Sequence, residues 1–129
     1  MEFVPYQAAH LPGIVALCEA EGWPSIPSDL ERAQRLLTNP GVHTYVAVES
    51  GQVLGFIYLL SDGEVQAYIA TMAVAAGRRG EGIGRSLIGA AFAACGAERI
   101  DLLSAADGFY AQLRHQRVPG FRLYPPFEH

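Results

Sequence analysis

The sequence has little of what several classes of protein require. Its 129 residues include only two cysteines, Cys18 and Cys95, and their spacing forms no metal-binding or disulfide pattern. We therefore expect two buried free thiols in a reducing compartment. The formal net charge is −4, which argues against a nucleic-acid-binding protein.

Long apolar segments are also missing. No apolar run approaches the roughly 20 residues that span a bilayer, and no signal-peptide pattern precedes the first expected strand. We expect no membrane association and a cytoplasmic location. The four histidines lack the spacing of a metal site or a catalytic triad, so we expect no metal.

What remains is the composition of a globular protein. Half of the residues are hydrophobic and 17% are charged, which favours a packed core over disorder. The length predicts one domain, residues 1–129, that buries enough surface to fold without disulfides.

Hydrophobic periodicity predicts alternating strands and helices. The fold class is α/β (α+β): a three-layer sandwich with a mixed, mostly antiparallel sheet and helices on both faces. Along the strand expected over 64–74, the odd positions suit a face packed against helices, and the even positions place Glu64, Gln66 and Tyr68 on the other face. The predicted strands are 3–6, 42–49, 53–60, 64–74, 99–103 and a last one within 117–124, and the predicted helices are 11–18, 30–37, 83–95 and 105–113.

The most informative stretch lies between the strand at 64–74 and the helix that follows. Glycines stand at 77, 80, 82 and 84, and three arginines, Arg78, Arg79 and Arg85, surround them. Glycine lets the backbone approach a ligand closely, and the free N–H groups at the start of a helix attract anions. Because guanidinium groups bind phosphates in a bidentate manner, we expect a polyphosphorylated ligand.

Spacing separates three kinds of glycine loop. The P-loop pattern needs a glycine at the position of Arg79 and a lysine at that of Arg85, so it fails. The dinucleotide pattern, begun at Gly80 and Gly82, needs a third glycine where Arg85 stands, so it fails as well. A third pattern, Arg/Gln-x-x-Gly-x-Gly/Ala, fits Arg79-Gly80-Glu81-Gly82-Ile83-Gly84.

At these residues the chain resembles the GNAT superfamily of acyl-CoA-dependent N-acetyltransferases. Val74 stands where that family usually leaves its fourth strand, and Phe109-Tyr110 is similar to its Phe-Tyr pair in the last helix. The chain departs from the family at Ala76, where a proline is common, and at Arg114-His115, where relatives often have Gly-Phe.

The resemblance implies acetyl-CoA as co-substrate. It implies that the strand end holds the pantetheine arm and that the glycine loop holds the pyrophosphate, with Arg78 facing either a ribose phosphate or water. The cofactor-binding residues are then Met72, Ala73, Val74, Arg79, Gly80, Glu81, Gly82, Ile83, Gly84, Arg85 and Ser86.

The resemblance also suggests catalytic and acceptor-binding residues. Tyr110 is the candidate general acid, since a phenol is well matched to a leaving thiolate; its alternative is a core aromatic residue. Some family members carry a glutamate base where Tyr68 stands, so Glu64, or a water held by Tyr68 and Gln66, is the candidate base. Trp23 and Tyr68 are expected to contact the acceptor, although Trp23 could equally be a packing residue.

These expectations describe an N-acetyltransferase that moves an acetyl group from acetyl-CoA to a primary amine of a small molecule or peptide by direct transfer. One alternative is a non-catalytic acyl-CoA-binding or sensing module on the same fold. Another is a nucleotide- or phosphate-binding protein of a different class. Strand edges expected near the C-terminus leave a homodimer open.

Overall fold

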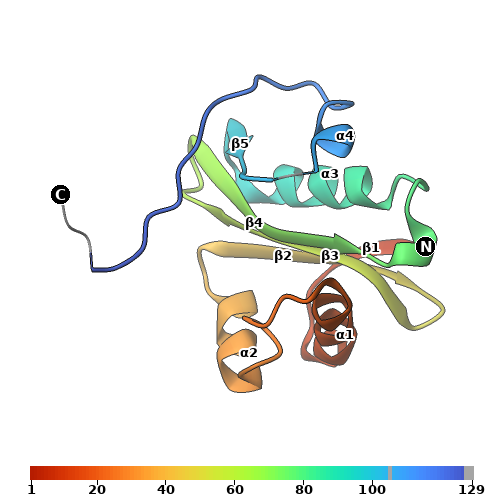
Figure 1. The fold of residues 1–129 in the computed structure, drawn as a ribbon. Coiled ribbons are helices and arrows are strands. Elements are labelled where there is room, and N and C mark those ends of the chain that lie inside the picture. The colour runs from red at the N-terminus through yellow and green to blue at the C-terminus, as the bar shows by residue number, and fades with distance from the viewer. Residues whose placement is uncertain (105, 127–129) are drawn as a thin grey trace.

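The computed structural model describes residues 1–104 and 106–126 (Figure 1). The described part contains a single sheet with the strand order β1-β2-β3-β4-β5. Strands β1 to β4 pair antiparallel with their neighbours, and β5 pairs parallel with β4, which confirms the mixed, mostly antiparallel sheet. The strands are β1 (Glu2–Pro5), β2 (Val42–Glu49), β3 (Gln52–Ser61), β4 (Gln66–Val74) and β5 (Arg99–Asp101).

Helices cover both faces of this sheet. Figure 1 shows α1 and α2 on one face and α3 on the other, with the short α4 on the same side as α3. Phe56 and Val46 belong to the core under α1 and α2, whereas Ile57 and Leu59 pack toward α3. The helices are α1 (Leu11–Glu21), α2 (Leu30–Thr38), α3 (Ile83–Cys95) and α4 (Asp107–Tyr110), with short 3-10 turns η1 (Ala8–His10) and η2 (Ala76–Arg78).

Local signals in the sequence explain several boundaries. Ser50 and Gly51 have φ values of 50° and 77°, as a two-residue hairpin turn between β2 and β3 requires. Asp29 caps α2, since its Oδ1 accepts a hydrogen bond of 3.1 Å from the Arg32 N–H. None of the helices in the described ranges is long and apolar enough to cross a membrane.

A β-bulge in β4 corrects the predicted faces of this strand. Tyr58 pairs with Thr71 but Leu59 pairs with Ile69, so Ala70 is an extra residue in β4. Beyond a bulge the alternation of side chains reverses. Ile69 therefore packs in the core under α3, while Ala73, also an odd position, packs in the opposite core under α1 and α2.

The C-terminal part of the chain differs more from its prediction. Strand β5 ends at Asp101 rather than at 103, and α4 covers 107–110 of the predicted helix 105–113, of which Ala105 lies outside the described residues. The strand predicted within 117–124 was wrong, because this segment is irregular in the structure. Pro119 and the pair Pro125-Pro126 remove N–H donors from this stretch, which disfavours a paired strand.

Candidate active site

The sheet opens into a cleft where β4 and β5 separate. Their pairing covers only Gln66–Tyr68 against Arg99–Asp101. Beyond that point a cavity of about 460 Å³ lies between the two chain segments, with residues 69–72 of β4 on one side and residues 102–104 after β5 on the other. This volume is within the range of pockets that hold small ligands.

The second half of β4 offers backbone groups to this cleft. Residues 69–74 pair with β3 on one side, but no strand in the described ranges pairs with their other side. In an antiparallel strand the backbone groups point alternately to the two sides, so this edge presents unpaired N–H and C=O groups. One of these carbonyls, that of Val74, accepts a hydrogen bond of 3.3 Å from Arg79 Nε.

The loop that follows β4 leads to the N-terminus of α3. Gly80 and Gly82 both have φ of +84°, a left-handed conformation that favours glycine. The first helical hydrogen bond of α3 runs from the Ser86 N–H to the Gly82 carbonyl at 3.1 Å. The N–H groups of the three residues between them therefore have no acceptor within the helix and, with the helix dipole, form an anion-binding end.

Gly55 of β3 brings this end of α3 close to the sheet. A Cβ on Gly55 would lie 3.1 Å from the Ala73 carbonyl oxygen and 3.2 Å from side-chain atoms of Ile83 and Leu87. Contacts this short are tighter than ordinary packing, so a side chain at position 55 would push α3 away. The lack of a side chain on Gly55 therefore helps to position the anion-binding end beside the strand end.

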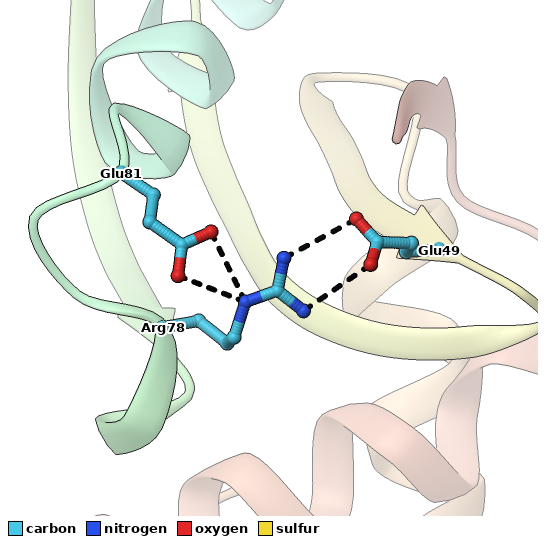
Figure 2. A network of polar contacts seen from close by, with 3 residues as sticks. All are labelled: Glu49, Arg78 and Glu81. Carbon is cyan, nitrogen blue, oxygen red and sulfur yellow. Dashed lines mark hydrogen bonds and ion pairs between the residues drawn. The ribbon is translucent and has the colours of Figure 1, made fainter.

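Arg78 lies between two carboxylates (Figure 2). Its Nε donates to both oxygens of Glu81 at 2.9 and 3.1 Å, and its two terminal nitrogens contact Glu49 at 3.2 and 3.4 Å. The hydrogen bonds that Arg78 donates to Glu81, followed by those to Glu49, raise the pKa of its guanidinium. Arg78 thus links the loop to the end of β2, and the ion pair with Glu81 holds Arg78 in place for this link.

Arg79, Arg85 and Ser86 are not part of this network around Arg78. Arg79 donates to the Glu21 carboxylate at the end of α1, besides its bond to the Val74 carbonyl. Arg85 and Ser86 are exposed in the first turn of α3. The loop therefore keeps two arginines, Arg79 and Arg85, near the helix end, and one of them is paired with an acidic group.

Tyr110, the predicted general acid, lies at the cleft. It is among the cleft-lining residues, and its ring meets that of Phe109 edge-on with centroids 4.9 Å apart. Burial raises the pKa of the Tyr110 phenol above its usual value. The hydroxyl therefore stays protonated through the physiological pH range.

The opposite wall comes from α1 and the segment after it. Trp23, predicted to contact the acceptor, lines the cleft and is 40% exposed. Beside it lie Ile26 and Cys18, both buried. Burial, followed by the charge of Glu21, raises the pKa of the Cys18 thiol to about 11, which keeps it from acting as a thiolate. The free, buried state expected for both cysteines is confirmed.

Two predicted site residues do not reach the cleft. Glu64 is exposed in the turn before β4, where its N–H donates to Asp62 Oδ1 at 2.8 Å. It precedes Ala70 by six residues, about 20 Å along an extended strand. Tyr68 stands opposite Leu60 in the paired part of β4 and is not among the cleft-lining residues.

Further residues line the cleft that were not predicted from the sequence. They include Tyr58 in β3, Leu103 after β5 and Arg122 in the C-terminal segment. The alternation of side chains along β3 could have placed Tyr58 on the face covered by α1. Arg122 could not be placed in the same way, because a strand was predicted within 117–124. No group of three His, Cys, Asp or Glu residues suited to a metal ion occurs within the described ranges.

Comparisons with known proteins identify the family. The profile of the acetyltransferase (GNAT) family matches residues 10–118, so the chain belongs to this family. A comparison with curated protein sequences gives no match.

Solved structures share the fold at low sequence identity. An aminoglycoside 6'-N-acetyltransferase, AAC(6')-IG, from Acinetobacter haemolyticus has a TM-score of 0.82 at 16% identity, and the match covers 100% of both chains. A ribosomal-protein-alanine N-acetyltransferase from Brucella melitensis has a TM-score of 0.74 at 14% identity, covering 96% of this chain and 99% of the other. AAC(6')-Iy, solved with a bisubstrate analogue of CoA, has a TM-score of 0.72 at 17% identity, covering 95% and 97%. These likenesses confirm the α+β fold.

Proposed function

We propose that this protein is an N-acetyltransferase that moves an acetyl group from acetyl-CoA to a primary amine of a small molecule or peptide. One observation carries the proposal: a single cleft is bordered by an unpaired strand edge and by Tyr110, and the strand leads into an anion-binding helix end. Membership of the acetyltransferase family supports the same activity.

The loop fits the pyrophosphate of coenzyme A. The amides of Ile83, Gly84 and Arg85 point toward the loop without helical acceptors, and Gly80 and Gly82 add no side chains of their own there. Arg79, Arg85 and the Ser86 hydroxyl add charge and hydrogen bonds at the same place. Glu81 contributes by holding Arg78 in the loop rather than by contact with the ligand.

The strand end fits the pantetheine arm. The amide groups of this arm can hydrogen-bond to the backbone of Met72 and Val74 as an added strand would, because this edge of β4 has no neighbour in the described ranges. Ala73, between them, directs its backbone groups toward β3. A backbone N–H in this segment is also the candidate donor to the oxyanion that forms during transfer.

Acetyl transfer from a thioester to an amine requires few side-chain groups. Acetyl-CoA supplies an activated thioester, and the acceptor nitrogen attacks it as a neutral amine. Tyr110, kept protonated by burial, donates its proton to the departing sulfur as the carbon–sulfur bond breaks. The nitrogen loses a proton to water as the amide bond forms, and water returns a proton to Tyr110. The protonated thiol of Cys18 favours direct transfer over a covalent enzyme intermediate. Glu64 is left out of this proposal because it lies far from the cleft.

A thiol-release assay with acetyl-CoA and a panel of amines tests the proposal. Tyr110→Phe should lower kcat by about 100-fold, the lower end for loss of a general acid, without weakening CoA binding. Tyr124→Phe is the matched control, because Tyr124 is a highly exposed tyrosine that does not line the cleft. Arg79→Ala should weaken CoA binding itself.

Other results would favour the alternatives. CoA binding without turnover of any amine, and without effect of Tyr110→Phe, would indicate a sensing or binding module. Tighter binding of ATP or NAD than of CoA would indicate a different class of phosphate-binding protein. If Arg79→Ala left CoA affinity intact, the pyrophosphate assignment would be wrong.

A homodimer is the remaining proposal about partners. Up to residue 126, the C-terminal segment exposes four large apolar residues, Val118, Phe121, Leu123 and Tyr124, between 65% and 88%. Exposed apolar groups of this size commonly mark contact surfaces, and this supports pairing with a second copy.

A further inference from the structure

The charge of the cleft bears on which amine it accepts, and this inference rests on the proposed function. Among the described residues that line the cleft, none is an aspartate or glutamate, and Arg122 alone carries a full charge. An acceptor that enters the cleft therefore meets one cation and no carboxylate.

Arg122 is brought to the cleft by the chain just before it. A Cβ on Gly120 would lie 2.3 Å from Leu103 Cδ2, so the backbone at Gly120 runs directly against the side chain of Leu103. Leu103 itself lines the cleft. Figure 1 shows this C-terminal segment leaving α4 and passing β5. The contact at Gly120 places the chain beside the cleft two residues before Arg122.

Arg122 differs from two of the three arginines of the glycine loop. Arg78 and Arg79 form ion pairs with glutamates, whereas Arg122 makes no ion pair within residues 1–104 and 106–126. A guanidinium group that lines a cleft without a carboxylate partner is suited to bind an anionic group of a ligand.

Aromatic and apolar side chains form part of the other walls of the cleft, beside the hydroxyl groups of Ser25, Thr71 and Ser104. Trp23, Ile26 and Tyr58 lie on the side of α1, and Ile69 and Leu103 belong to the two separated segments. These side chains suit the apolar body of a ligand.

We propose that the acceptor is a small primary amine with an apolar or aromatic body and an anionic group, a carboxylate or a phosphate, which Arg122 binds. Polycationic amines are poor acceptors by the same reasoning, because Arg122 repels them and no cleft-lining carboxylate compensates. An aminoglycoside, with several ammonium groups, belongs to this disfavoured class.

Acetyl transfer to matched amines tests the proposal. L-phenylalanine is compared with L-phenylalaninamide, phosphoethanolamine with ethanolamine, and kanamycin serves as the polycation. We expect kcat/KM to be at least tenfold higher for the anionic member of a pair, and lowest for kanamycin. The two pairs distinguish a carboxylate from a phosphate as the preferred anion. Equal or better turnover of the neutral amines or of kanamycin would overturn the proposal.

Arg122→Gln isolates the role of the guanidinium. It should raise KM for the preferred anionic amine about tenfold, change kcat less than twofold, and leave the neutral partner unaffected. Arg114→Gln, which removes a charge from the same segment outside the cleft lining, is the control and should change neither value. Equal effects of the two substitutions would contradict the assignment.

A binding measurement separates this inference from the proposed function. Trp23 is the only tryptophan and lines the cleft, so its fluorescence reports acceptor binding without turnover. With CoA present, phenylalanine or phosphoethanolamine should change the fluorescence in the unmodified protein and less so in Arg122→Gln. If no amine is acetylated but this signal persists, the proposed function fails and the anionic ligand class holds. If amines are acetylated but the signal does not depend on Arg122, the inference fails alone.

Discussion

The ring of Phe109 lies directly against Gly84. A Cβ built on Gly84 would be 3.1 Å from Phe109 Cζ and 3.5 Å from Met72 Cε. The sequence motif suggests that Gly84 serves the pyrophosphate, but the structure shows a second requirement, since α3, α4 and β4 meet at this residue. The position of Tyr110, next to Phe109, therefore depends on the size of residue 84.

Gly84→Ala should disturb the site without unfolding the protein. The added methyl crowds Phe109, a form of overpacking that typically costs about 1–3 kcal/mol, while alanine improves helix propensity by about 1 kcal/mol. We expect kcat/KM for acetyl-CoA to fall about tenfold with a small change in melting temperature. Gly89→Ala is the control, because a Cβ there meets nothing within 4 Å; it should raise stability by about 1 kcal/mol and leave activity unchanged. Similar behaviour of the two variants would refute the role of the Phe109 contact.

Glu21→Gln should strengthen CoA binding slightly. Glu21 holds Arg79, whose side chain is 57% exposed, and exposed ion pairs of this kind contribute about 0–1 kcal/mol. Releasing Arg79 for the diphosphate should therefore lower the Kd for CoA by up to about fivefold, measured by calorimetry at low salt. Glu19→Gln removes the same charge from the same helix without this pair and should have a smaller effect. Weaker binding in Glu21→Gln would mean that the carboxylate orients Arg79 for the ligand.

The raised pKa of Tyr110 predicts that this residue does not limit activity at high pH. Its neutral form is the acid, and burial extends that form to higher pH than the usual value of about 10. We expect kcat/KM to rise between about pH 7 and 9.5 as the acceptor ammonium loses its proton, with no fall caused by Tyr110 in this range. A decline in activity below about pH 9 that Tyr110→Phe abolishes would show that the pKa of this residue is not raised.

The exposed C-terminal segment predicts a dimer. Gel filtration with light scattering should give a mass near twice that of the 13.9 kDa chain at micromolar concentration. Phe121→Ser, at a residue that is 88% exposed, should shift the protein toward the monomer, whereas Phe92→Ser on α3, 37% exposed, should not. A monomeric unmodified protein would disprove this prediction.

Much of the fold could be predicted because local signals agree with it. The turn residues Ser50-Gly51, the cap at Asp29 and the apolar spacing of α3 each determine an element through contacts close in sequence. The glycine motif from Arg79 to Gly84 also predicted the strand-loop-helix junction that the structure contains.

The rest depends on contacts between distant segments. The pattern of apolar and polar residues along β4 does not predict the extra residue at Ala70, because this bulge depends on the pairing with Tyr58 and Leu59 in β3. The pairing of Arg78 with Glu49, and the approach of Gly120 to Leu103, likewise join residues far apart in the chain. Of the expected site, Trp23 and Tyr110 meet at one cleft, while Glu64 does not join them.

The bulge at Ala70 has a consequence for how this strand tolerates changes in length. It sends the odd-numbered residues at the start of β4, Ala67 and Ile69, to one layer of the sandwich and Ala73 near its end to the other. Removing Ala70 would join Ile69 to Thr71 in regular alternation and would leave Met72 and Ala73 in their present layers. Evolution can therefore shorten this strand by one residue at the bulge without turning over the residues that follow.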